Sequence, residues 1–182
     1  MEQQHQHQPA GRQYGRFALM ILASTCIMYG LMYLNTYQID HVTFSQTRVW
    51  MALLMGAAMA FVMMAFMWSM HPQKGVNAAI LAGSVAIFAV SLWLVRSQQT
   101  VDDVSYMSAM IPHHSIAIMT SERAHIRDPR VRELADGIIR SQVKEIGEMK
   151  DLIAELRQNP PAPDAPDIPS YRKRGVVAPV AD

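Results

Sequence analysis

Methionine and histidine side chains recur at helical spacing in the C-terminal half of the chain. Met107, Met110 and His114 follow one another at steps of three and four residues, so on a helix they share one face. His113 lies at the edge of that face, three residues after Met110. Thioether sulfur selects soft ions such as Cu(I), and neutral imidazole also suits Cu(II), Zn and Fe. The pattern therefore indicates a transition-metal site, with copper as the first candidate.

A second polar pair lies within an apolar stripe further along the chain. Gln142 and Glu145 occupy the middle of a predicted helical seam with steps of three and four residues. The seam consists of Leu134, Ile138, Gln142, Glu145, Met149, Leu152 and Leu156. Burying an amide and a carboxylate there costs on the order of a few kcal/mol unless partners lie opposite, and the preceding methionines and histidines are the expected partners. The alternative is that the methionines only fill a core and that the histidine pair and Glu145 are solvated.

The segment from Tyr106 to Met149 resembles a known family. It reads YMSAMIPHHSIAIM and, after a short gap, DPRVRELADGIIRSQVKEIGEM. A paired-histidine motif followed by a helix with Gln, Glu and Met is similar to the ferritin-like, CopM-like family of bacterial copper-binding proteins, which is catalogued as a domain of unknown function (DUF305). The matching positions are Met107, Met110, Ile111, His113, His114, Ala117, Ile118, Met119, Gln142, Glu145 and Met149.

The resemblance implies a metal site and a partner. The implied ligands are Met107, Met110, His113, His114, Met119, Gln142, Glu145 and Met149. They would bind copper, favoured as Cu(I), or silver, in the service of metal tolerance on the periplasmic side of a bacterial membrane, with other transition metals as alternatives. The resemblance also implies half of a ferritin-like four-helix bundle. Because the chain has one such hairpin, we expect a second copy to complete the bundle.

Two helices are predicted to position these residues. The first begins at Asp102 and Asp103 and runs to about His125. Pro112 interrupts it, and should bend it and free a backbone carbonyl. Asp128 is a plausible N-cap, with Pro129 in the first helical position, for a second helix over 130–157. The sequence thus predicts a soluble hairpin over 98–158, followed by a proline-rich, disordered tail over 159–182.

Three apolar runs precede the hairpin. They cover residues 17–37, 49–70 and 76–95, and each approaches or exceeds the roughly 20 residues that a helix needs to cross a bilayer. Trp50 and Trp68 bracket the second run about 27 Å apart, close to the hydrocarbon thickness. The small residues Gly56, Ala60, Ala79 and Gly83 are expected to let helix backbones approach closely, and the three helices are expected to pack on one another. The predicted fold is all-α, with a transmembrane region over 17–96 after a disordered cytoplasmic tail over 1–16.

Basic residues near the ends of these runs predict the orientation. Arg12, Arg16 and Lys74 lie on the side of the N-terminus, against Arg48 and Arg96 on the other side. The majority places the N-terminus in the cytoplasm and the hairpin in the periplasm, as in a multi-pass protein of the bacterial inner membrane. The net charge of +1, without basic residues gathered on one face, argues against nucleic-acid binding.

Three functions are compatible with these features. The first is a membrane-anchored protein that binds copper or silver for metal homeostasis, with lipid and a second copy as partners. The second is a metal transporter or transporter subunit that uses a methionine row in the second span, formed by Met51, Met55, Met59, Met63 and Met67. The third is a ferritin-like oxidoreductase, for which Glu122 and His125 show the Glu-x-x-His spacing, although the following helix contains no histidine. An enzyme is the less favoured class.

Overall fold

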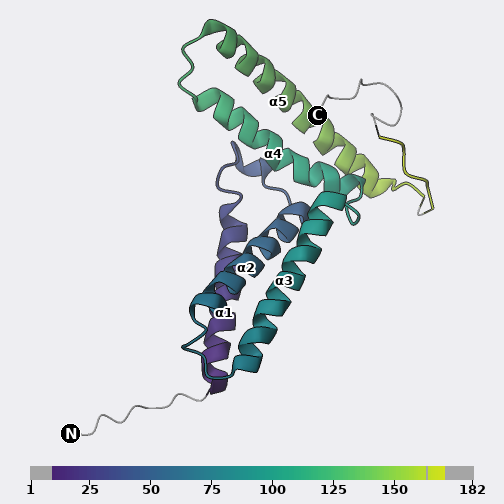
Figure 1. Ribbon diagram of the computed structural model, residues 1–182. Helices are drawn as coiled ribbons and strands as arrows, with labels where there is room; N and C mark the ends of the chain where they lie inside the picture. The colour runs from purple at the N-terminus through teal and green to yellow at the C-terminus, as the bar shows by residue number, and fades with distance from the viewer. Residues whose placement is uncertain (1–9, 163, 171–182) are drawn as a thin grey trace.

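The computed structural model describes residues 10–162 and 164–170, and this part of the chain is all-α (Figure 1). Three helices long and apolar enough to cross a membrane are followed by two helices of a soluble hairpin, which confirms the predicted fold class. A short 3-10 helix, η1 (Ile39–His41), lies between the first two helices. The five α-helices of the described residues are α1 (Ala10–Leu31), α2 (Gln46–Phe66), α3 (Lys74–Ser97), α4 (Asp103–Arg123) and α5 (Pro129–Gln158).

The first helix lies further toward the N-terminus than its hydropathy predicts. It begins at Ala10, so residues 10–16, which were expected to belong to a disordered tail, are helical, whereas residues 1–9 of that tail lie outside the described part. The hydroxyl of Tyr14 donates to Asn77 Oδ1 at 2.8 Å and thereby ties this end to α3. The helix ends at Leu31 instead of Tyr37, because the following residues leave the helix axis to contact the hairpin.

The three membrane-length helices pack unequally. α2 packs along α3 and also contacts α1, but no Cα atom of α1 lies within 8 Å of α3. A Cβ atom on Gly56 would collide with Thr25 Oγ1, so glycine at this position allows the approach of α1 to α2. The predicted close approach therefore occurs at Gly56, where α2 meets α1, but not at Gly83, where a Cβ atom would meet no heavy atom within 4 Å.

The hairpin has an apolar core between α4 and α5. Both helices begin at the predicted aspartates, since Asp102 accepts from the Ser105 amide at 2.7 Å and Asp128 from the Arg130 amide at 2.8 Å. The buried core side chains are Met107, Ile111, Ile118, Ile146, Met149 and Ile153. After Gln158 the chain has no regular secondary structure in residues 159–162 and 164–170, and the rest of the predicted tail lies outside the described part.

The predicted seam of α5 was only partly right. Its members Met149 and Leu156 pack in the hairpin core, but Leu134 is 66% exposed and Leu152 is 47% exposed. Ala135 and Ile153, each one residue further along, are buried in their place. Adjacent stripes on a helix share the same steps of three and four residues, so periodicity alone could not tell which of them faces α4. The consequence is that α5 keeps an apolar stripe on its solvent side.

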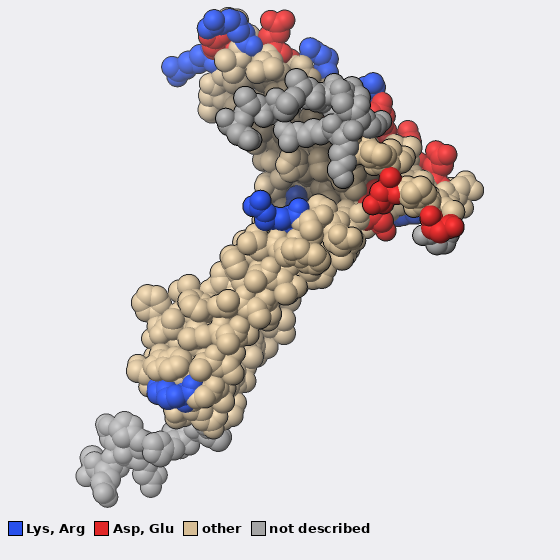
Figure 2. Space-filling model, turned by 45° about the vertical axis from the view of Figure 1, so that its right-hand side comes forward, with Lys and Arg blue, Asp and Glu red and all other residues tan. Residues whose placement is uncertain are grey.

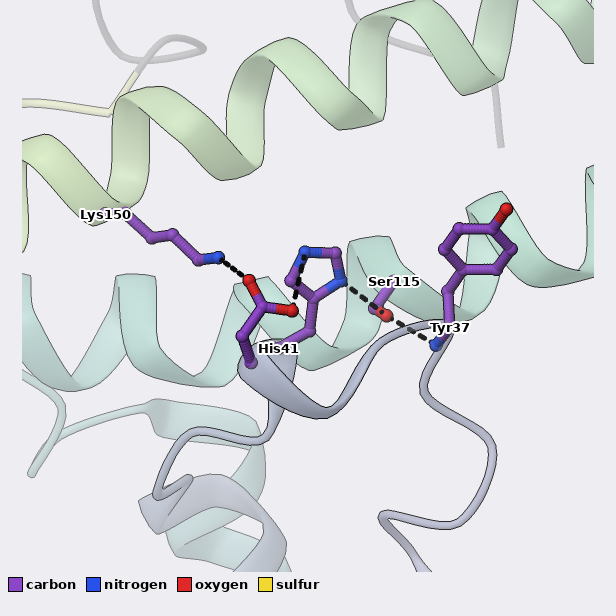
Figure 3. Close-up of polar contacts among 5 residues, drawn as sticks. Tyr37, His41, Ser115 and Lys150 are labelled. Atoms are coloured by element: carbon purple, nitrogen blue, oxygen red, sulfur yellow. Dashed lines mark hydrogen bonds and ion pairs between the residues drawn. The ribbon is translucent and has the colours of Figure 1, made fainter.

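The connection between α1 and α2 docks onto the hairpin. We call residues 32–45 the docking loop. Its Tyr37 amide donates to Ser115 Oγ at 2.7 Å, and His41 Nδ1 lies 2.9 Å from the same oxygen (Figure 3). Lys150 of α5 donates to Asp40 Oδ2 at 2.7 Å. The hairpin is therefore held against the end of the three-helix bundle by contacts to both of its helices (Figure 1).

Pro112 explains one of these contacts. The helix α4 continues through Pro112, so the predicted interruption does not occur, yet proline cannot donate to the carbonyl four residues earlier. That carbonyl belongs to Ser108, and it accepts a hydrogen bond from Thr43 Oγ1 of the docking loop at 2.6 Å. The expectation of a freed carbonyl is confirmed, and its partner comes from a distant part of the chain.

Candidate metal site

His114 and Glu145 meet between the two helices of the hairpin. His114 Nδ1 lies 3.1 Å from Glu145 Oε2. The imidazole side chain is 14% exposed and the carboxylate side chain is 41% exposed, so the pair lies at the border between the hairpin core and solvent. This contact joins the first predicted set of site residues to the second.

Two neighbours on α5 orient the carboxylate. Ser141 Oγ donates to Glu145 Oε1 at 2.7 Å, and Gln142 Nε2 lies 3.4 Å from Glu145 Oε2 as a donor. Both lie within one helical turn of Glu145, so the backbone of α5 sets their positions. Gln142 was predicted from the sequence, whereas Ser141 was not, because a serine on a helix surface gives no distinguishing pattern.

The ionisation of His114 favours the metal-binding form. Burial lowers the pKa of His114 below its ordinary value, Glu145 opposes this effect, and His113 adds to it. The imidazole is therefore neutral at neutral pH, and the contact with Glu145 is not a charged ion pair under these conditions. The Nδ1 atom is also buried without a hydrogen-bond partner among the described residues, since the direction to Glu145 does not suit a hydrogen bond.

This geometry fits an ion between the two side chains. Two donors that each lie about 2.1 Å from one ion are about 3.0 to 3.4 Å apart at angles between 90° and the tetrahedral value. The separation of 3.1 Å between His114 Nδ1 and Glu145 Oε2 falls in that interval. The pair could thus supply one nitrogen and one oxygen donor to an ion.

The predicted methionine ligands are distributed between the core and its margin. Met107 and Met149 are buried in the apolar core of the hairpin, and Met110 packs against that core while partly exposed. Met119 is also partly exposed. Thioethers in these positions fill space, and their flexibility lets a sulfur atom turn toward an adjacent ion. Met107 and Met149 therefore have a packing role whether or not they bind metal.

His113 lies on the open side of the hairpin. It is exposed, and its ring centroid is 6.1 Å from that of His114 with an angle of 59° between the planes. Within residues 10–162 and 164–170, no three His, Cys, Asp or Glu side chains come close enough together to hold an ion. A metal at His114 and Glu145 would need thioether or amide donors, or donors from another molecule, to complete its coordination.

The Glu-x-x-His spacing considered for an oxidoreductase does not form a site. Glu122 lies near the end of α4, and His125 follows that end, because the helix stops at Arg123. Both side chains are exposed. The spacing therefore does not project two ligands into the hairpin as a di-iron bundle requires.

A polar cluster under the hairpin was not predicted from the sequence. His41 and Ser115 are buried at the contact between the docking loop and α4. Ser115 directly follows the paired histidines, but its side chain points to the docking loop (Figure 3). Only the tertiary contact between residues more than 70 positions apart identifies this cluster, and the local sequence pattern contains no signal for it.

Comparison with known proteins gives a family. The family model described as "Domain of unknown function (DUF305)" matches residues 103–175. A protein of Acanthamoeba polyphaga mimivirus, described as uncharacterized, is 34% identical over 142 residues, which cover 76% of this chain and 91% of the relative. Residues 103–175 therefore form a DUF305 domain. No solved structure matches it.

The DUF305 match and the hairpin begin at the same residue. Asp103 is the first residue of α4, and the match includes both helices of the hairpin and all eight predicted ligands. The stretch from Asp103 to the end of the chain is too short for 142 aligned residues, so the similarity to the viral protein also includes part of the region of α1, α2 and α3. The similarity to the viral protein thus extends beyond the DUF305 match into residues before Asp103.

Proposed function

We propose that this DUF305 protein is a membrane-anchored metal-binding protein that takes up copper or silver at the periplasmic face of a bacterial inner membrane, for metal homeostasis or tolerance. The observation that carries the proposal is the buried His114 Nδ1, which has no hydrogen bond among the described residues and lies 3.1 Å from Glu145 Oε2. The three apolar helices provide the anchor, since their length and composition suit a bilayer.

The donors around this pair favour a soft ion. Met110 lies at the margin of the core on the same face as His114, and Met107 lies one turn before it. Thioether and imidazole donors together suit Cu(I), and Ag(I) is its closest chemical analogue. Glu145 would supply only one partly exposed carboxylate to such a site. Hard divalent cations prefer several oxygen ligands, so they are disfavoured here.

A second copy of the chain is the proposed partner at the hairpin. Leu134, Ile138 and Leu152 form an apolar stripe on the solvent side of α5, next to Glu145. A two-helix hairpin leaves such a stripe uncovered, whereas two hairpins bury it in a four-helix bundle. His113 then lies where it can contribute to a site between the copies. Leu134→Gln should give a monomer by light scattering, and unchanged mass would contradict this arrangement.

The proposed orientation follows from the charged ends of the three helices. Arg12, Arg16 and Lys74 lie at the end remote from the hairpin, and Arg48 and Arg96 lie at the hairpin end (Figure 1). The larger basic set belongs on the cytoplasmic side. The hairpin, which carries most of the charged residues, then lies in the periplasm (Figure 2).

The test is a Cu(I) titration of the full chain in detergent, under reducing conditions and against a competing chelator. His114→Ala should remove one bound ion or weaken it by at least about tenfold, because it removes the donor nearest Glu145. Met110→Leu should weaken the same ion while conserving volume.

His125→Ala is the matched control, since this histidine is exposed at the hairpin turn and touches neither helix core. It should bind as the wild type does. An unchanged stoichiometry and affinity in His114→Ala and Met110→Leu would overturn the proposed site.

A further inference from the structure

A second methionine and histidine pocket lies at the opposite end of the membrane-length helices. Its cavity, of about 600 Å³, opens between the start of α1 and the end of α2. The residues that line it include Gln13, Phe17 and Met20 of α1 together with Met67, Met70 and His71. None of these belongs to the hairpin, so the pocket is separate from the site at His114.

His71 is held in the form that binds a metal. Its Nδ1 lies 3.1 Å from the carbonyl oxygen of Met67. A carbonyl oxygen only accepts, so Nδ1 must carry the ring proton of the neutral imidazole, and Nε2 keeps the lone pair. Metal-binding histidines commonly donate their other N–H to a backbone carbonyl in this way. No hydrogen bond to His71 Nε2 occurs among the described residues.

The surroundings of His71 keep its ring in place. The residue is 3% exposed, and its ring lies against Tyr14, with centroids 5.0 Å apart, and edge-on to Phe17 at 5.9 Å. The fully buried Asn77 donates to the His71 carbonyl at 3.3 Å and accepts from Tyr14 at 2.8 Å. A donor whose ring and backbone are both held loses little conformational freedom on binding.

The remaining polar and sulfur groups of the pocket select a soft, singly charged ion. Met20, Met67 and Met70 line it together with His71, and none of its lining residues is acidic. Arg16 is its one ionised residue, which disfavours a divalent cation. Gln13 Oε1 is buried there without a hydrogen-bond partner among the described residues and adds a neutral oxygen.

We propose that this pocket is a second binding site for Cu(I) or Ag(I), with His71 Nε2 and the thioethers of Met20, Met67 and Met70 as its donors. Three flexible thioethers can converge on an ion that a fixed imidazole holds. The site goes beyond the proposed function, because it stands on different residues and at the other end of the bundle from the hairpin. Met67 also ends the methionine row of α2, so an ion bound here would occupy one end of that row.

The test uses the full chain in detergent, in a His114→Ala background, with Cu(I) titrated under reducing conditions against a competing chelator. One tightly bound ion should remain in this background. Adding His71→Ala should remove it, and adding Met70→Leu or Met20→Leu should weaken it by at least about tenfold. Met70 is 68% exposed, so its substitution leaves the fold intact even where His71→Ala does not.

Matched controls separate this site from the hairpin site. Two substitutions should leave the remaining ion unchanged: Met51→Leu, which lies in α2 outside the pocket, and His125→Ala. X-ray absorption of the bound copper should show mixed nitrogen and sulfur ligands, with sulfur lost in Met70→Leu. The second site would be overturned if no tight ion bound in the His114→Ala background. It would also be overturned if that ion bound unchanged in Met70→Leu and Met20→Leu. Neither outcome affects the test of the hairpin site, which compares the wild type with His114→Ala.

Discussion

His41 is a buried histidine that joins the docking loop to the hairpin. Its Nδ1 lies 2.9 Å from Ser115 Oγ, and its Nε2 lies 3.9 Å from Asp40 Oδ1 (Figure 3). Burial lowers the pKa of His41, Asp40 opposes that shift, and Lys150 adds to it. The folded protein therefore favours the neutral imidazole at this contact.

The first prediction concerns the pH dependence of stability. Above about pH 6.5, His41 is neutral in both the folded and the unfolded chain, and its burial carries no protonation cost. As the pH falls below that value, the unfolded chain takes up the proton first, so stability is lost until the pH passes the lower folded pKa. The thermal midpoint in detergent should fall on acidification, and His41→Gln should reduce the fall.

The pKa of His114 is lowered as well, so His41→Gln removes only part of the effect. The exposed His125 provides the control, and His125→Gln should leave the pH profile as in the wild type. Equal acid destabilisation in His41→Gln and the wild type would contradict the role given to His41.

At the scale of single elements, α4 depends on a hydrogen bond from outside the helix. Pro112 lies within α4 and is fully buried. Because proline has no backbone N–H, it cannot donate to the Ser108 carbonyl four residues earlier. Thr43 supplies that partner at 2.6 Å. The proline and the docking loop therefore act as a pair.

A double-mutant cycle tests this pairing. Thr43→Val should destabilise the protein by about 1 kcal/mol or more, because a part-buried carbonyl loses its donor. In a Pro112→Ala background the new backbone N–H can bond to Ser108, so the same substitution should cost less, with a coupling of about 1 kcal/mol. Denaturation in detergent measures both differences, and strictly additive effects would exclude the pairing.

The elements themselves were largely predictable, and their contacts were not. Asp102 and Asp128 mark helix starts through local hydrogen bonds that the sequence displays. The stripe of α5 that faces α4 was predicted only in part: Met149 does pack in the core, but Leu134 and Leu152 do not, because adjacent stripes share one periodicity. The contacts of the docking loop to Ser108, Ser115 and Lys150 join residues 65 to 110 positions apart, and no local pattern encodes such a distance.

The candidate site was likewise predictable in part. The sequence offered the methionines and histidines of the first hairpin helix as partners for Gln142 and Glu145, and the structure brings one of them, His114, to 3.1 Å from Glu145. Gln142 also lies beside Glu145, as its position one turn before it predicts. The burial of Met107 and Met149 in the core was less evident, because a methionine that packs and a methionine that binds occur at the same spacing.

At the scale of the whole molecule, charge and hydrophobicity are separated. Acidic and basic side chains gather on the hairpin, whereas the three-helix bundle is almost uncharged between its two ends (Figure 2). Such a division suits a molecule that has its bundle in lipid and its hairpin in water.

Labelling of single cysteines tests the orientation. In a Cys26→Ser background, Gly147→Cys on the hairpin should react with an impermeant maleimide added to cells with a permeable outer membrane. Gly75→Cys at the opposite end should react only after the cells are lysed. Both glycines are exposed, and a Cβ at either meets no atom within 4 Å, so the two variants are matched. The reverse pattern would place the hairpin in the cytoplasm.

The docking loop also has a consequence for biogenesis. The docking loop is synthesised well before α4. The Thr43 hydroxyl and the Tyr37 amide therefore have no partner until Ser108 and Ser115 have been translated. The membrane helices and the hairpin can each form from neighbouring segments, whereas their union needs contacts between residues 65 to 110 positions apart. We therefore expect docking of the hairpin to be a late step, because the partners of Thr43, Tyr37 and Asp40 are all synthesised after α3.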